Sequence, residues 1–165
     1  MTTQEILAEV MADPAPKGWT LKALKHIASM SEETHCFSAN LYIDGVKAAS
    51  ISNHGHGGPD MVDWTSAAAE KSALATVSGT QDLKEYGSDS VLSDDACFEI
   101  TIGNMVNDAL LLKDVKKSVK KGQFPIGVYA EDAPYSGFIF GLRSLDNLAK
   151  FLAEYKATRY RVFHL

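Results

Sequence analysis

Residues 36–53 read CFSANLYIDGVKAASISN, and this stretch decides the fold. Up to residue 43 its apolar residues alternate with more polar ones, a period of two that is typical of a β-strand with one buried face. Asp44-Gly45 then supplies the positive backbone φ angles that a two-residue type I′ turn requires, so the sequence predicts a β-hairpin. The pairs expected from this turn are Ile43 with Val46, Leu41 with Ala48 and Ala39 with Ser50.

Other segments supply helices and further strands around this hairpin. Apolar spacing and the positions of proline and capping residues predict helices over 3–12, 61–77 with Asp60 as its cap, 93–112, and 145–152 with Ser144 as its cap. Strands are predicted over 19–27, 124–129, 136–142 and 160–165. We therefore expect one α+β domain over residues 1–165, in which helices cover an antiparallel sheet built on hairpin 36–53. Residues 79–93 are polar and rich in glycine and serine, and are expected to form a flexible connection.

The composition excludes several functional classes. The chain has 165 residues, with 16 Lys and Arg against 21 Asp and Glu, and a net charge of −5 is too acidic for a general nucleic-acid coat. The two cysteines, Cys36 and Cys97, form no Cys-x-x-Cys pair and are expected to be buried, which favours a reducing compartment and hence the cytoplasm. No apolar run is long enough to span a membrane, and the N-terminus does not resemble a secretory signal.

The loop over residues 53–60, NHGHGGPD, contains the residues best suited to bind a metal ion. His54, His56 and Asp60 could converge as ligands for zinc or manganese, because imidazole nitrogens and a carboxylate are common ligands of such ions. The far end of the hairpin strand, with Glu32, Glu33 and His35, would lie opposite this loop. If the protein is an enzyme, Glu33 is the candidate general base. Otherwise the glycines serve backbone turns, the histidines bond loop carbonyls, and no cofactor is expected.

A run of lysines forms the other candidate site. Residues 113–121, KDVKKSVKK, contain five of the basic residues of an acidic protein. Val115 and Val119, four residues apart, indicate one buried helical stripe with the lysines solvated around it. The run could contact nucleic acid or an acidic partner, although lysines without interleaved aromatic residues read bases poorly. The candidate binding residues are Lys113, Lys116, Lys117, Lys120 and Lys121.

Three segments together resemble a pattern found in small uncharacterised proteins of tailed bacteriophages and prophages. They are MSEETHCF at 30–37, LYIDG at 41–45 and NHGHGG at 53–58, and the pattern is E-T-x-C-F, Y-x-D-G and N-x-G-x-G-G. The resemblance covers about residues 28–60, and the family has no assigned activity. It implies a phage-encoded accessory protein that binds a host or defence macromolecule without catalysis. His54 stands where the resemblance leads us to expect Asp, which weakens the case for a metal site.

Three functional hypotheses follow. A recognisable constellation of acid, base and nucleophile is missing from the sequence, so non-catalytic binding, with a protein as partner, is the main expectation. A metal-dependent hydrolase that uses His54, His56 and Asp60 is the first alternative. A nucleic-acid-binding module that uses the lysines of residues 113–121 is the second.

Overall fold

A computed structural model describes residues 15–81, 89–130, 133–154 and 159–162. The chain divides into two compact units, one formed by Ala15–Val106 and one that includes Asn107–Leu165. Helix α3, Asp94–Lys120, contributes its first half to one unit and its second half to the other. The expected single domain stays a prediction. Residues 82–88 of the expected connection over 79–93 lie outside the described residues, as does the expected helix over 3–12.

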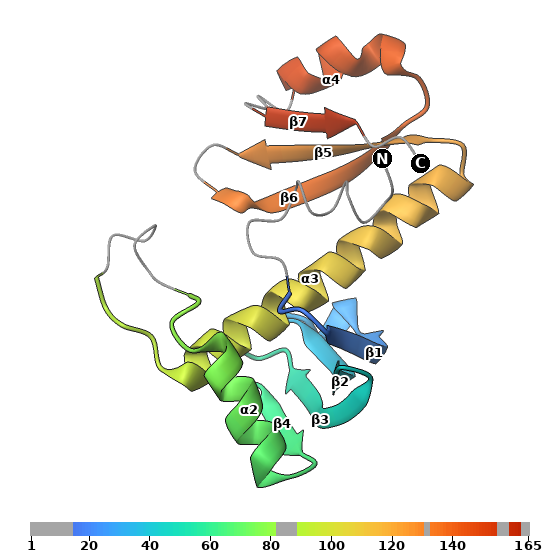
Figure 1. The fold of residues 1–165 in the computed structure, drawn as a ribbon. Coiled ribbons are helices and arrows are strands. Elements are labelled where there is room, and N and C mark those ends of the chain that lie inside the picture. Colours follow the sequence, from blue (N-terminus) through green and yellow to red (C-terminus); the bar gives the residue numbers. More distant parts are fainter. Residues whose placement is uncertain (1–14, 82–88, 131–132, 155–158, 163–165) are drawn as a thin grey trace. The chain divides into compact units, whose positions relative to one another are not determined.

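The first unit is built on an antiparallel sheet of four strands, called sheet A here, with helices beside it (Figure 1). The strands follow one another in chain order, with neighbours hydrogen-bonded. They are β1 (Trp19–His26), β2 (Cys36–Ile43), β3 (Val46–His54) and β4 (Met61–Trp64), and a short 3₁₀ helix η1 (Ala28–Met30) lies between β1 and β2. The α+β class, the hairpin at its centre and the strand expected from residue 19 are confirmed.

The hairpin turns at Asp44 and Gly45, whose φ angles of 49° and 82° are both positive, as a type I′ turn requires. Ile43 pairs with Val46 as predicted, but the other two predicted pairs are wrong. Leu41 lies opposite Ala49 and Ala39 opposite Ile51, because β3 carries an extra residue after the first pairs. Because of this extra residue, Ile51 faces the core and is only 2% exposed, whereas the predicted register would have placed Ser50 there.

The inner face of sheet A carries the core of the first unit. Phe98 of α3 lies between Trp19 of β1 and Trp64 of β4, with ring centroids 5.9 and 5.1 Å apart. The apolar residues buried around it include Phe37, Ala39, Leu41, Ala49, Ile51, Cys97, Ile102 and Val106. Because each large side chain of this kind contributes about 1.5–3 kcal/mol when buried, this helix-on-sheet contact is the main stabilising feature of the unit.

The helix predicted over 61–77 is wrong in its first part. Residues 61–64 form β4, and helix α2 begins later, at Ala67, and ends at Val77. The strand forms because Val62 and Trp64 face the core opposite Ile51 and Ala49, while the residues between them face outward. The cap of α2 is therefore Ser66, whose side chain accepts a hydrogen bond from the Ala69 N–H, rather than Asp60. The loop after β3 connects two strands.

The second unit has a three-stranded antiparallel sheet, sheet B, in the order β6-β5-β7. Its elements are β5 (Phe124–Ala130), β6 (Ala133–Leu142), the 3₁₀ helix η3 (Leu145–Asn147), α4 (Leu148–Glu154) and β7 (Arg159–Val162). The predicted hairpin and the helix capped by Ser144 are confirmed, while residues 163–165 of the last predicted strand lie outside the described residues. Among the described residues, no helix combines the length and apolar character needed to cross a membrane.

Candidate functional site

Asn53 organises the loop between β3 and β4, called the glycine loop here (Asn53–Asp60). Its side chain is buried, with 6% exposed. The Oδ1 atom accepts hydrogen bonds from Thr34 Oγ1 and the Gly55 N–H, both at 2.8 Å. The Nδ2 atom donates to the Gly58 carbonyl and to Asp60 Oδ1, both at 2.9 Å. Four hydrogen bonds use the full capacity of a primary amide, so Asn53 fixes both ends of the loop.

The segment Glu32–Thr34 closes over the glycine loop. The backbone N–H groups of Glu32 and Glu33 donate to the Gly55 carbonyl at 3.0 and 3.1 Å. Gly55 and Gly57 have φ angles of 86° and 82°, and a Cβ atom on Gly57 would collide with the Glu33 carboxylate. The prediction that this segment lies opposite the loop is therefore confirmed, and both glycines are needed for backbone shape.

The candidate metal ligands have different surroundings. His54 is exposed at the end of β3, and the exposed His56 ring contacts Glu32 Oε2 through Nδ1 at 3.3 Å. Asp60 is partly buried instead, and its N–H donates to Glu99 Oε1 of α3 at 3.0 Å. Within residues 15–81, 89–130, 133–154 and 159–162, no group of three or more His, Cys, Asp or Glu side chains is placed to hold a metal ion. The zinc or manganese site, with Glu33 as its base, stays a prediction.

Burial raises the pKa of Asp60, hydrogen bonding by the Asn53 amide lowers it, and the negative charge of Glu99 raises it. The net shift is upward. The carboxyl group accepts a hydrogen bond from the Asn53 amide within the glycine loop, and the Asp60 backbone N–H links the loop to Glu99 of α3.

His26 and His35 form a pair that was not predicted from the sequence. His26 Nε2 lies 3.1 Å from His35 Nδ1, and the rings meet edge to face. Ser31 Oγ lies 3.3 Å from His26 Nε2, donates to the Ile27 carbonyl and accepts from the Cys36 N–H. The sequence gives no signal for this cluster, because β1 and β2 must first be paired. Cys36 and Cys97 are free and buried, as expected.

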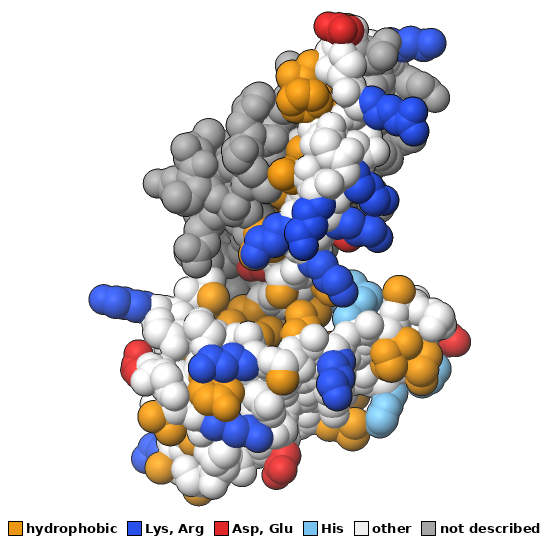
Figure 2. Space-filling model, turned by 90° about the vertical axis from the view of Figure 1, so that its right-hand side faces the viewer, with side chains coloured by type: hydrophobic (Ala, Val, Ile, Leu, Met, Phe, Trp, Pro, Cys, Tyr) orange, Lys and Arg blue, Asp and Glu red, His pale blue; other side chains and the backbone are white. Residues whose placement is uncertain are grey.

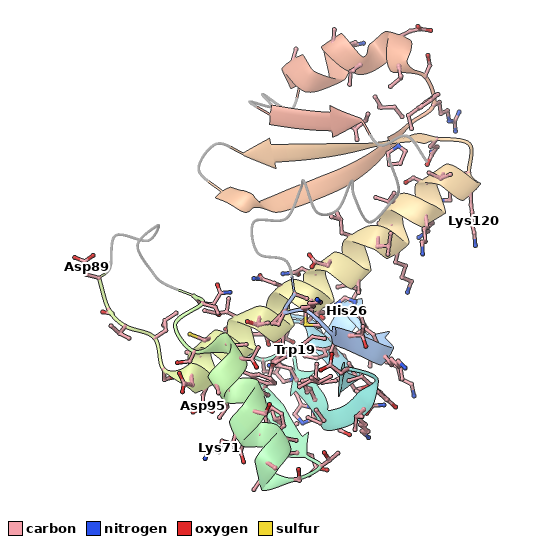
Figure 3. The ribbon with its side chains drawn as sticks, in the orientation of Figure 1. Trp19, His26, Lys71, Asp89, Asp95 and Lys120 are labelled. Atoms are coloured by element: carbon pink, nitrogen blue, oxygen red, sulfur yellow. The ribbon has the colours of Figure 1, made fainter. Side chains whose placement is uncertain are left out.

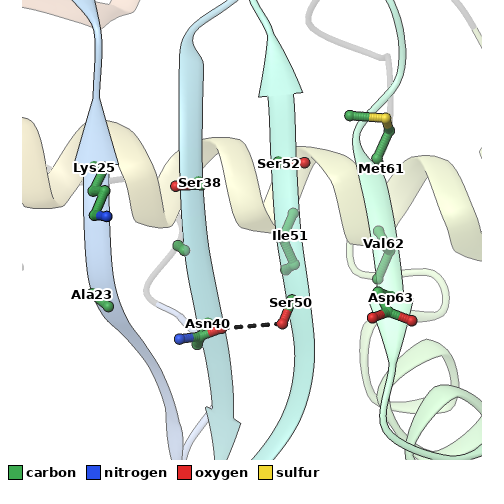
Figure 4. A pocket seen from close by; sticks show the side chains of 11 residues that line it. Ala23, Lys25, Ser38, Asn40, Ser50, Ile51, Ser52, Met61, Val62 and Asp63 are labelled. Carbon is green, nitrogen blue, oxygen red and sulfur yellow. Dashed lines mark hydrogen bonds between the residues drawn. The ribbon is translucent and has the colours of Figure 1, made fainter.

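The outer face of sheet A is a second candidate site, and the strand register defines it. Side chains that do not face the core form three rows across the sheet. The rows are Thr20, Tyr42 and Lys47; then Lys22, Asn40, Ser50 and Asp63; then Lys25, Ser38, Ser52 and Met61. Figure 4 shows a shallow hollow here, with α3 behind the sheet on the opposite side. No described element of residues 15–106 covers this face.

The charges of the outer face lie at its border. Lys22 and Lys25 are on the edge strand β1, Lys47 follows the hairpin turn, and Asp63 is on the opposite edge strand β4. The centre consists of serine and asparagine, and Ser50 Oγ donates to Asn40 Oδ1 at 3.1 Å. The Lys22 ammonium lies 4.3 Å from the centroid of the Tyr42 ring, which is a cation–π contact.

The edges of sheet A are less suitable for binding than its face. In β1, the register shifts between Lys22 and Lys25, and Ala23 has a positive φ of 53°. Such an irregularity, together with lysines on an edge strand, hinders the addition of another strand. At the other edge, β4 has only 4 residues.

The lysines of residues 113–121 lie on the second half of α3 and directly after it. Lys113, Lys116, Lys117, Lys120 and Lys121 are all exposed and are called the lysine ridge here. Figure 2 shows basic side chains along the exposed side of this helix, and Figure 3 places Lys120 at its C-terminal end. Val115 is 1% exposed, as predicted for the buried stripe, whereas Val119 is only partly buried.

The chain matches no protein-family model, no curated protein and no solved structure.

Proposed function

We propose that the protein acts by non-catalytic binding of a partner protein, and that the outer face of sheet A is the binding surface. The observation that carries this proposal is the arrangement of the face, with a neutral polar centre inside a charged border. The face shares two features with protein interfaces, whose centres are depleted of charge and whose rims are polar. The resemblance of residues 28–60 to small phage proteins supports an accessory role directed at a host or defence macromolecule.

The composition of the face favours a protein over single-stranded nucleic acid. Tyr42 and the half-exposed Met61 belong to residue types that are enriched at protein interfaces. Tyr42 is the one aromatic residue of the outer face, and Lys22 already covers its ring. Proteins that hold single strands use several aromatic side chains on which successive bases stack.

The border charges indicate the chemistry of the partner. Lys22, Lys25 and Lys47 occupy the β1 and hairpin sides of the face, so the partner presents acidic groups there. Asp63 on β4 calls for a basic group on the opposite side. The hydroxyl groups of Ser38 and Ser52, which make no side-chain hydrogen bond to another described residue, can bond the centre of the partner surface.

The test places a bulky charge in the centre of the face. Ser38→Arg and Ser52→Arg each point away from the core, so the fold should be retained. Ser72→Arg, at an exposed position of α2, is the matched control. In affinity capture from the native cell, read by mass spectrometry, one partner should be bound by the wild-type protein and the control but lost from both outer-face variants. A partner that all four proteins bind equally would overturn the proposal, as would the absence of any captured partner.

A further inference from the structure

The lysine ridge presents its charges on one side of the helix. Its members occupy positions i, i+3, i+4, i+7 and i+8. At 3.6 residues per turn, these positions fall within an arc of roughly 140°. The Lys121 N–H donates to the Ser118 carbonyl at 3.0 Å, so this last lysine continues the final turn. Val115 is buried on the opposite side, so the lysines form the solvent side of an amphipathic segment.

An ordinary solvated helix face does not account for this pattern. Such faces mix acidic and basic residues, because opposite charges four residues apart stabilise a helix and like charges destabilise it. The segment 113–121 has one exposed acidic residue, Asp114, against three pairs of lysines at that spacing, and the protein as a whole is acidic. The pairs are Lys113 with Lys117, Lys116 with Lys120, and Lys117 with Lys121.

The helix dipole accounts for only part of the ridge. Cations near a helix C-terminus are favourable, but the effect is confined to the last turn. Lys117 and Lys120 lie in that turn, whereas Lys113 lies a full turn earlier.

We propose that the lysine ridge binds the phosphate backbone of nucleic acid. The ridge spans about 12 Å of helix axis, which gives one positive charge per about 2.4 Å, and duplex DNA carries one negative charge per about 1.7 Å. The exposed arc holds no aromatic or large apolar residue that could form the centre of a protein interface. Phosphate contacts, in contrast, need only cations and give binding without base readout. The ridge and the outer face of sheet A share no residue, so either proposal can fail while the other stands.

The test is binding of the full chain to a fluorescent mixed-sequence DNA duplex of about 20 base pairs, at several salt concentrations. With five phosphates contacted, the logarithm of the affinity should fall against the logarithm of salt with a slope of about −4.5. The affinity should therefore drop roughly 500-fold between about 50 and 200 mM salt. Replacing all five ridge lysines by Gln, a good helix former, should weaken binding at the lower salt by roughly 100-fold.

A control variant removes four exposed basic residues that lie outside both the lysine ridge and the outer face of sheet A. Its substitutions are Lys17→Gln, Lys71→Gln, Arg143→Gln and Lys150→Gln. This variant should bind DNA within about 3-fold of wild type, because the contacts that release counterions remain. A milder variant, Lys116→Gln with Lys120→Gln, should reduce the magnitude of the slope by about two if folding of the five-fold variant is impaired.

Three results would overturn the proposal. The first is no binding of DNA by the wild-type protein at the lower salt concentration. The second is an equal loss of binding in the ridge and control variants, which would reflect net charge alone. The third is equally tight binding of polyglutamate with the same salt slope, because the ridge would then be a surface for acidic proteins.

Discussion

Replacement of Asn53 by alanine tests whether one buried amide holds the glycine loop together. The wild-type side chain makes four hydrogen bonds of 2.8–2.9 Å, to Thr34, Gly55, Gly58 and Asp60. Each such bond contributes about 1 kcal/mol net, and a buried partner left without one costs more. Gly58 is exposed and regains water, so we expect Asn53→Ala to lower the free energy of unfolding by about 2–4 kcal/mol.

Urea denaturation followed by tryptophan fluorescence is the assay, because Trp19 and Trp64 both report on the first unit. Asn40→Ala is the matched control. Asn40 is a partly exposed amide on the outer face with one side-chain hydrogen bond, to Ser50, and its replacement should cost less than about 1 kcal/mol. Equal losses in the two variants would refute the central role of Asn53.

Asn53→Asp sharpens the same test. One carboxylate oxygen can still accept from Thr34 and Gly55, but the other would replace a donor and face Asp60 Oδ1, an acceptor. We expect a larger loss of stability at neutral pH than in Asn53→Ala, and a partial recovery near about pH 4, where one of the two carboxyl groups binds a proton. A loss that does not change with pH would contradict this geometry.

The remaining predictions concern the core, a partly buried acid and a tight turn. Phe98→Ala should lower the free energy of unfolding by about 3–5 kcal/mol, measured by urea denaturation, because its ring packs between two tryptophans; a loss under about 1 kcal/mol would contradict that packing. Burial raises the pKa of Asp108 to about 7, so the folded protein keeps this proton to higher pH than the unfolded chain, and stability should fall as pH rises from about 4 to 7. Asp108→Asn should remove this part of the pH dependence, which urea denaturation at about pH 5 and pH 8 measures. If the variant keeps the wild-type difference in stability between the two pH values, burial of Asp108 is not its cause. Gly57→Ala should cost at least about 1 kcal/mol because of its positive φ and the neighbouring Glu33 carboxylate, whereas Gly58→Ala, which meets open space, should be nearly neutral; equal thermal stability of the two variants would exclude this explanation.

The hairpin could be predicted from the sequence because Asp44-Gly45 is a local turn signal, but the irregularity in β3 could not. Ala48 and Ala49 are both small and both buried, so the sequence pattern alone does not say which of them faces Leu41. The choice is made by Ile51, which has to reach the core, and that depends on contacts across the whole sheet.

Strand β4 was missed for a similar reason. Residues 61–64 are too short to establish a period, and the alanine-rich segment after them extended the predicted helix backwards. Pairing with β3 decides that Val62 and Trp64 belong to a strand, and such pairing is tertiary information.

The candidate sites differ in how far the sequence could predict them. The lysine ridge and the position of Glu32 and Glu33 beside the glycine loop follow from local spacing and from the hairpin. The outer face does not, because its rows depend on the register. In the simple register, Ser50 would lie opposite Ala39 and face the core, and the polar centre of the face would not exist.

Photo-crosslinking tests the central claim, binding through the outer face of sheet A, most directly. A crosslinking residue at position 52 lies in the centre of the face, and one at the exposed position 72 on α2 serves as the control. If the outer face binds the partner, irradiation of cells should link a single partner protein to position 52 and nothing to position 72. The same products from both positions, or none from position 52, would contradict this claim.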